Sequence, residues 1–238
     1  MKILVVGGGG REHAIVWKIA QSPKVDKIYC APGNGGIAEL AECVDIAATD
    51  IENMVKFAKD NAIDLVMVAP DDPLVLGMVD AMEKEGIRAF GPRANAAIIE
   101  GSKAFSKELM KKYNIPTANY EVFTDSTSAI DYIKAQNTFP TVIKADGLAL
   151  GKGVIIAQNL EEAEQAVHEM IDDGKFGKSG SRVVIEEFLT GPEVSVLAFT
   201  DGKTVKPMVS AQDHKRAYDN DEGLNTGGMG TFSPSRLY

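Results

Sequence analysis

The first hundred residues alternate short apolar strands with amphipathic helices, and this alternation constrains the fold more than any other feature of the chain. Strands are predicted over residues 3–6, 27–30 and 64–69, with a helix over residues 11–21. Repeated strand–helix units favour parallel strands, because each helical crossover returns the chain to the same edge of the sheet. We therefore predict that the chain begins with a doubly wound parallel-sheet α/β domain.

Two further helices and a strand complete this predicted domain. Thr49 and Glu52 have the spacing of a capping box, which predicts the start of a helix. One apolar helix is predicted over residues 74–85, and a short strand over residues 88–90.

After about Gly101 the pattern changes to an α+β arrangement. A helix is predicted over residues 102–113, with Phe105, Leu109 and Tyr113 on one face. Helices are also predicted over 126–136 and from 159, and strands over 120–124, 141–145, 154–157, 182–188, 193–200 and 204–210. We therefore predict one domain over residues 1–101 and a second region over residues 102–238.

The charge balance narrows the class of partner. The chain has 25 basic and 34 acidic residues, for a net charge of −9. This excess disfavours a general nucleic-acid or anionic-membrane surface. Apolar runs such as residues 63–70 are too short to cross a bilayer, and the start of the chain does not have the pattern of a signal peptide. We expect a cytoplasmic protein with no membrane or nucleic-acid partner, in which Cys30 and Cys43 are buried, reduced thiols.

Four consecutive glycines, Gly7 to Gly10, follow the first strand and open the first helix, where backbone N–H groups favour an anion. No register gives the dinucleotide fingerprint, because the sixth position is Glu12 or His13. Two interpretations stay open. The glycines and Arg11 hold a phosphate, or the glycines form a tight turn with Arg11 in solvent.

A second glycine-rich segment runs from Lys144 to Gly153 and lies between two predicted strands. Such a loop can turn several backbone amides toward one anion. It lacks the Walker pattern, and a strand rather than a helix follows it. Lys103, in the first turn of a predicted helix, opposes the helix dipole unless an anion binds there. Together these features favour a loop that covers phosphates over a mobile hairpin with two surface lysines.

Two later segments are candidates for ligand binding. The apolar strand that ends in Glu186 and Glu187 can offer backbone groups to an adenine ring, and Glu193 can accept from ribose hydroxyls. The alternative is an amphipathic strand with an acidic turn. The charged run from Asp213 to Arg216 and the glycine-rich run from Asn225 to Gly230 suit a substrate that bears phosphate or carboxylate groups, although a solvated charged loop is the alternative.

Together these motifs resemble the phosphoribosylamine–glycine ligase family of ATP-grasp enzymes, which act in purine synthesis. The resemblance rests on EGSKAF at 100–105, KADG and GKGV within 144–154, QDHKR at 212–216 and the run at 225–230. It covers the whole chain in order. It implies a partial ATP-grasp region over residues 102–238, with a small lid subdomain at about 118–190.

The resemblance also implies the reaction and its site. ATP would phosphorylate the glycine carboxylate, and the amine of phosphoribosylamine would attack the acyl phosphate, giving glycinamide ribonucleotide, ADP and phosphate. The ATP-binding residues it implies are Lys103, Lys144, Asp146, Gly147, Gly151, Lys152, Gly153, Glu186, Glu187, Phe188, Leu189 and Glu193. The implied substrate-binding residues are Gly9, Gly10, Arg11, Glu12, Asp213, His214, Lys215, Arg216, Asn225, Thr226, Gly227, Gly228, Met229 and Gly230. Among all these, the catalytic residues would be Lys144, Asp213, Lys215 and Arg216.

The chain departs from the family in two respects. The family usually has Gly-Pro-Glu where this chain has Ala69-Pro70-Asp71, so the contacts of that loop are in doubt. Family members are also longer, and the ligands for Mg²⁺ or Mn²⁺ are expected beyond residue 238. If these residues are the whole polypeptide, we expect an incomplete enzyme that binds nucleotide weakly and is inactive alone.

Two other functions remain as alternatives to the ligase. One is a non-catalytic module that binds ATP or a phosphoribosyl group, and the other is a Rossmann oxidoreductase, which the failed fingerprint disfavours. The small-molecule partners expected for the ligase are ATP, glycine and phosphoribosylamine. The oligomeric state is left open.

Overall fold

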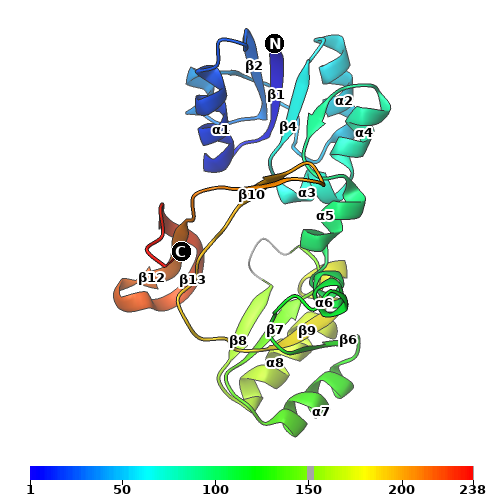
Figure 1. Cartoon of the computed structure of the whole chain (residues 1–238). Helices are drawn as coiled ribbons and strands as arrows, with labels where there is room; N and C mark the ends of the chain where they lie inside the picture. The colour runs from blue at the N-terminus through cyan, green and yellow to red at the C-terminus, as the bar shows by residue number, and fades with distance from the viewer. Residues whose placement is uncertain (149–152, 238) are drawn as a thin grey trace. The chain divides into compact units, whose positions relative to one another are not determined.

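A five-stranded parallel sheet organises the amino-terminal part of the computed structural model, which describes residues 1–148 and 153–237 (Figure 1). The strands lie in the order β3-β2-β1-β4-β5. Their bounds are β1 Lys2–Gly7, β2 Lys27–Pro32, β3 Glu42–Cys43, β4 Leu65–Val68 and β5 Ala89–Phe90. Every pairing between them is parallel, so the prediction of a doubly wound parallel sheet is confirmed.

Both faces of this sheet are buried, as the alternating side chains of β1 show. Leu4 and Val6 pack into one apolar cluster, whereas Ile3 and Val5 pack into another that includes Val16 of α1. A strand covered on both faces reads as a continuous apolar run, which is why β1 was recognisable in the sequence. The covering helices are α1 Gly10–Ala20, α2 Ile51–Asp60, α3 Asp71–Val75 and α4 Met78–Lys84, with a short 3₁₀ turn at Ile37–Glu39. Helix α5, Ala94–Gly101, contacts α3, α4 and α6.

Two predictions about these helices are wrong. The N-cap of α2 is Asp50 and not Thr49, because the Asp50 carboxylate accepts from the backbone N–H of Asn53 at 3.2 Å. The single helix predicted over residues 74–85 is two helices, α3 and α4, separated at Gly77. The φ of Gly77 is 91°, a left-handed conformation that a helix interior does not contain and that glycine adopts readily. Helix α5 was not predicted.

A four-stranded antiparallel sheet follows, in the order β6-β9-β7-β8. Its strands are β6 Tyr120–Phe123, β7 Thr141–Ala145, β8 Val154–Ala157 and β9 Val183–Glu187. Helices α7 Ser126–Gln136 and α8 Leu160–Ile171 cover one face, and their apolar side chains form one cluster with Ile143 and Ile185 (Figure 1). A 3₁₀ turn at Gly177–Gly180 precedes β9.

Helix α6, Lys103–Lys112, connects the two sheets along the chain and turns an unexpected face inward. Its buried residues are Ala104 and Lys107, whereas Phe105 and Tyr113 are 39% and 61% exposed. The face predicted from Phe105, Leu109 and Tyr113 is therefore not the main buried one. The helix predicted over residues 102–113 is itself confirmed. Periodicity assigns lysines to the solvent-facing side, so it does not predict the burial of Lys107.

The chain divides into two compact units, Met1–Glu187 and Phe188–Tyr238. The second unit contains two antiparallel hairpins, formed by β10 Ala198–Thr200 with β11 Val205–Pro207, and by β12 Gln212–Tyr218 with β13 Glu222–Phe232 around the 3₁₀ turn Asp219–Asp221. The strands predicted over 193–200 and 204–210 are thus shorter than expected. The boundary near residue 101 and the lid over 118–190 stay predictions.

The two cysteines differ in burial, which corrects the prediction that both are buried. Cys30 and Cys43 are both free thiols on neighbouring strands, and Cys43 is exposed. Burial raises the pKa of the Cys30 thiol to about 12, with a smaller contribution from Cys43. Within the part of the chain that the structure describes, no helix has the length and apolar character needed to cross a membrane.

We expect a thiol reagent at pH 8 to modify Cys43 rapidly and Cys30 only after unfolding, because the thiolate is the reactive form. A colorimetric disulfide reagent should therefore titrate one thiol in the native chain and both in denaturant. Cys43→Ser should abolish the native signal. Rapid reaction of two thiols in the folded protein would contradict this assignment.

Candidate active site

The glycines after β1 form a tightly packed turn at the carboxyl edge of the parallel sheet. A Cβ atom on Gly7, whose φ is +119°, would lie 2.7 Å from the Glu12 side chain, and one on Gly8 would lie 2.6 Å from the carbonyl oxygen of Gly33. The backbone here makes approaches that only glycine permits. The loops that follow β1 and β2 are therefore in direct contact.

Glu12 is 4% exposed and its carboxylate accepts from the backbone N–H of Gly9 at 2.6 Å, so it caps the start of α1. The Arg11 side chain is 60% exposed and its Nε lies 3.2 Å from Glu12 Oε1. Gly10 has open space around it. Of the four residues predicted to bind the phosphoribosyl group, Glu12 has a structural partner, and Arg11 is available to a ligand.

Asn34 joins this site, although sequence reasoning missed it. Its Nδ2 donates to the Gly8 carbonyl at 2.9 Å, and its Oδ1 accepts from the Ile37 backbone N–H. Asn34 therefore fixes the loop after β2 against the glycine turn. The turn-rich sequence around Asn34 was the available signal, since asparagine commonly bonds to nearby backbone in such turns.

Asp146 lies at the base of the second glycine-rich loop, and its carboxylate is bonded to three protein groups. Its Oδ1 accepts from the backbone N–H of Ala104 at 2.7 Å and from Ser102 Oγ at 3.0 Å. Its Oδ2 accepts from Arg182 Nε at 2.9 Å and also contacts the Arg182 Nη2. Asp146, 8% exposed, thus ties the start of α6 to the end of β7 and to the residue before β9. Arg182 was not predicted.

Lys103 is held beside the same loop. Its backbone N–H donates to the Asp146 carbonyl and its Nζ to the Gly147 carbonyl, both at 3.0 Å. Burial lowers the pKa of Lys103, and the nearby Asp146 carboxylate opposes that shift. A bound anion would raise the pKa again, because an opposite charge stabilises the protonated amine. The position suits an anionic ligand.

Lys144 and Glu186 form the centre of the site in the first unit. Lys144 Nζ donates to Glu186 Oε2 at 2.8 Å, and Lys107 Nζ lies 3.2 Å from the same oxygen. Glu186 is 6% exposed, so its carboxylate is committed to these two ammonium groups. A pocket of about 240 Å³ is lined by Ile99, Glu100, Lys103, Ser106, Lys107, Met110, Lys144 and Glu186. The structure therefore brings the predicted Lys103, Lys144 and Glu186 together.

Two glycines of the glycine-rich loop, Gly147 and Gly153, lie within the described residues. The Gly147 backbone N–H donates to the Ser179 carbonyl at 3.3 Å, and a Cβ on Gly147 would lie 2.5 Å from Ser179 Oγ. Gly153 accepts from the Ala145 backbone N–H at 2.8 Å. The predicted ligands Gly151 and Lys152 lie outside the described residues.

At the end of β9, Glu187 Oε2 accepts from Asn119 Nδ2 at 3.0 Å. Phe188 and Leu189 come directly after it, and Leu189 is 62% exposed. Glu193 belongs to the second unit.

In the second unit the hairpin β12–β13 gathers several predicted residues. Lys215 Nζ donates to Glu193 at 2.7 Å and lies 3.3 Å from Asp213, and these hydrogen bonds raise the pKa of Lys215. Arg216 donates to the Gly223 carbonyl at 2.7 Å, and Thr226 Oγ1 donates to the Lys215 carbonyl. The remaining predicted residues of this hairpin are His214, Asn225, Gly227, Gly228, Met229 and Gly230, and His214 is paired in register with Gly230.

The described residues do not supply a divalent-metal site. Across residues 1–148 and 153–237, no three His, Cys, Asp or Glu side chains gather in a way that could hold a metal ion.

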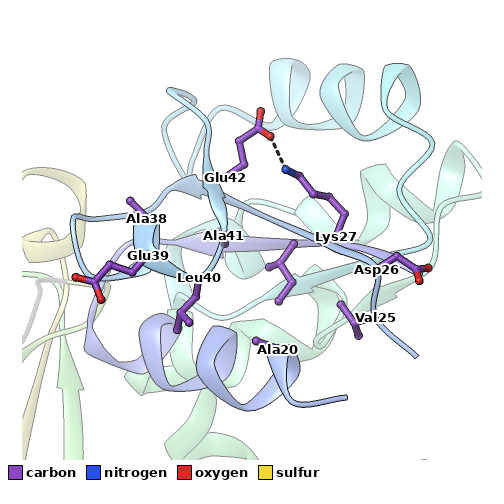
Figure 2. A pocket seen from close by; sticks show the side chains of 10 residues that line it. Ala20, Val25, Asp26, Lys27, Ala38, Glu39, Leu40, Ala41 and Glu42 are labelled. Atoms are coloured by element: carbon purple, nitrogen blue, oxygen red, sulfur yellow. Dashed lines mark ion pairs between the residues drawn. The ribbon is translucent and has the colours of Figure 1, made fainter. Parts of the chain in front are cut away.

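A separate groove of about 480 Å³ lies where β2 begins, at the opposite edge of the parallel sheet from the glycine turn (Figure 2). Lys27 and Glu42 form an ion pair of 2.8 Å at its margin (Figure 2). None of the predicted site residues lines it.

Comparison with known families matches the chain along its length. Residues 1–100 match the model of the phosphoribosylglycinamide synthetase N domain, and residues 101–238 match that of the phosphoribosylglycinamide synthetase ATP-grasp (A) domain.

Among curated relatives, the phosphoribosylamine–glycine ligase of Halalkalibacterium halodurans is 56% identical over 234 residues, which are 98% of this chain and 54% of the relative. That of Haemophilus influenzae is 55% identical over 237 residues, 99% of this chain and 55% of the relative. The chain thus spans about half the length of the curated relatives it matches.

Solved structures are also similar to this chain. The crystal structure of phosphoribosylamine–glycine ligase from Thermotoga maritima is 32% identical, with a TM-score of 0.83, over 99% of this chain and 56% of that one. A biotin carboxylase domain from Hydrogenobacter thermophilus, solved with MgADP, is 17% identical with a TM-score of 0.75, over 90% of this chain and 50% of that one, and shows a shared fold.

Proposed function

The chain belongs to the phosphoribosylglycinamide synthetase family, and on this premise we propose that it forms part of an ATP-dependent carbon–nitrogen ligase that joins glycine to phosphoribosylamine. In this reaction a glycine carboxylate oxygen attacks the γ-phosphorus of ATP, which releases ADP and gives glycyl phosphate. The amine of phosphoribosylamine then attacks the glycyl carbonyl and phosphate leaves. The amide product is glycinamide ribonucleotide, a purine precursor.

The observation that carries the proposal is the lysine-lined pocket beside the glycine-rich loop. Lys103 and Lys144 both line it, and the loop base at Gly147 holds Lys103. To catalyse phosphoryl transfer, a protein mainly has to position the reacting groups and place positive charge near the phosphate oxygens. Lys103 and Lys144 therefore bind the nucleotide phosphates, and the loop over residues 146–153 covers them and excludes water from the acyl phosphate.

Asp146 and Glu186 take positioning roles in this proposal. Their carboxylates already accept from protein donors, so neither is free to bind the nucleotide directly. The adenine ring is bound by backbone groups of Glu187 to Leu189, and the ribose by Glu193.

The acceptor and glycine sites are assigned to the hairpin β12–β13. Lys215 and Arg216 orient the glycine carboxylate and stabilise the acyl phosphate, and Asp213 positions Lys215. The run 225–230 provides close backbone approach through its glycines. The glycine turn after β1, with Arg11, binds the phosphate of the phosphoribosyl group.

The proposal is tested on the 238-residue chain by calorimetric titration with ATP and magnesium, followed by assay of phosphate release with glycine and phosphoribosylamine. We expect ATP binding, and glycine-dependent phosphate release supports the ligase reaction. ATP binding without release is also the result expected of an incomplete enzyme, so glycine-dependent release is the outcome that separates the ligase from a non-catalytic nucleotide-binding module. Binding of a nicotinamide dinucleotide with no binding of ATP would overturn the proposal.

Lys144→Ala should weaken ATP binding by about 10-fold, because one charge-assisted contact to phosphate is lost. The free energy of unfolding should fall by no more than about 1 kcal/mol, because Lys107 still pairs with Glu186. Calorimetry and thermal unfolding measure the two effects. Lys134→Ala is the matched control, since it removes a half-exposed lysine of α7 that pairs with Glu164 of α8. Equal ATP affinity of the two variants would remove Lys144 from the site.

A further inference from the structure

Lys107 is a buried charged residue to which the proposed reaction gives no role. Its side chain is 9% exposed. Its Nζ donates to Thr117 Oγ1 at 2.7 Å and to the Ala118 carbonyl at 3.3 Å, and it lies 3.2 Å from Glu186 Oε2. Two of its three N–H donors thus have backbone or hydroxyl acceptors, and the ammonium group also forms an ion pair with Glu186. Lys107 is therefore held in place by these protein groups.

Stability alone gives little reason for a lysine at this position. Removing an ammonium group from water is costly, and apolar residues of similar volume commonly replace buried ion pairs with no loss of stability. The neighbouring buried position on α6 is an alanine, Ala104, so this face of the helix accepts apolar side chains. The charge at Lys107 is better explained by what it does to Glu186.

Glu186 links Lys107 to Lys144. The same carboxylate oxygen, Oε2, receives Lys144 Nζ at 2.8 Å and lies beside Lys107 Nζ. One negative charge thus faces two positive charges, and the three groups together carry a net charge of +1. With Lys107 absent, Glu186 would pair with Lys144 alone, and the pair would be neutral.

From this arrangement we infer that Lys107 is a positioning residue for the nucleotide phosphates. Lys107 shares the Glu186 carboxylate with Lys144, so Lys144 is fixed in place while the three groups keep a net positive charge beside the pocket. The inference rests on the proposed function, in which Lys144 binds phosphate. The Lys144 side chain is 27% exposed, three times as much as that of Lys107, so Lys144 is the member of the pair that a ligand reaches.

Tyr120 supports the same assignment. Lys107 Nζ lies 5.3 Å from the centroid of the Tyr120 ring, and Tyr120 is paired in register with Glu186 across β6 and β9. The ring and the two oxygen acceptors hold the ammonium group in one place. Lys107 is thus held on one side of Glu186 by Tyr120 of β6 and by Thr117 and Ala118, which precede β6.

The test is a double-mutant cycle on ATP affinity, measured by calorimetry in the presence of magnesium. Lys107→Met should weaken ATP binding about 5-fold in the otherwise unchanged chain and should have almost no effect in the Lys144→Ala background, because its effect passes through Lys144. A purely structural role would instead give the same loss in both backgrounds. Equal losses, or no loss in the unchanged chain, would overturn the inference.

A second Lys107 variant and the results for the unchanged chain and Lys144→Ala separate the failure of this inference from the failure of the proposed function. Lys107→Gln retains a donor for Thr117 and tests the lost charge if Lys107→Met does not fold, and the same cycle applies to it. If the unchanged chain binds no ATP, or Lys144→Ala binds it equally well, the proposed function fails. If Lys144→Ala weakens binding and Lys107 variants show no coupling, only the role of Lys107 fails.

Discussion

Replacing Asp146 with alanine is expected to lower the free energy of unfolding by about 2–4 kcal/mol, because it leaves a buried N–H without an acceptor and a guanidinium without its partner. The N–H is that of Ala104, and the guanidinium is that of Arg182. Arg182 is 42% exposed, so water replaces part of the lost interaction and the upper end of the usual range for buried pairs is not reached.

Urea unfolding followed by circular dichroism measures this change in the free energy of unfolding. Two further variants serve as references. Asp146→Asn keeps an oxygen acceptor for Ala104 but loses the charge opposite Arg182, so its destabilisation should lie between those of the unchanged chain and Asp146→Ala. Asp131→Ala alters an exposed carboxylate of α7 and should change the free energy of unfolding by less than about 0.5 kcal/mol. A stability of Asp146→Ala equal to that of Asp131→Ala would show that the contacts at Asp146 contribute nothing.

Gly8→Ala is expected to destabilise the chain by about 1–3 kcal/mol, because the new methyl group has no space. Its Cβ would lie 2.6 Å from the Gly33 carbonyl oxygen, a backbone atom that cannot move as a flexible side chain does. The loops after β1 and β2 would have to separate, and the hydrogen bond from Asn34 to the Gly8 carbonyl would be strained with them.

Gly10→Ala is the matched control for this substitution. Gly10 is the first residue of α1 and has no atom within 4 Å of an added Cβ, so alanine there should be neutral or stabilising by about 0.5–1 kcal/mol. Thermal unfolding of both variants gives the comparison. If Gly8→Ala were as stable as Gly10→Ala, the close contact between the two loops would not exist in solution.

The parallel sheet could be predicted because its signal is local. Strands such as β1 are apolar on both faces, and glycine and proline mark where they end, so their existence and order were readable from the sequence. The cap of α2 was misplaced by one residue, because Thr49 and Asp50 are both good capping residues and only backbone geometry decides between them. Gly77 divides a segment whose apolar pattern continues on both sides.

The candidate site was predicted where its residues have a distinctive type and spacing. Lys103, Lys144 and Glu186 were singled out in this way, and the structure places them around one pocket. Lys107 and Arg182 were missed because their ion-pair partners, Glu186 and Asp146, are far from them in the sequence. No local sequence pattern indicates these ion pairs. Burial of a charge is a property of the tertiary fold, and periodicity assigns such residues to the surface.

The bonds at Asp146 also bear on the order in which the chain folds. Asp146 is separated by 44 residues from Ser102 and by 36 from Arg182, so both partners are brought to it by closing long segments of chain. During synthesis Arg182 emerges last, after the whole of α7, β7, β8 and α8. The start of α6 and the base of the loop over residues 146–153 therefore reach their final geometry only when β9 inserts between β6 and β7. The lysine-lined pocket therefore depends on β9, which carries Glu186, being in place between β6 and β7.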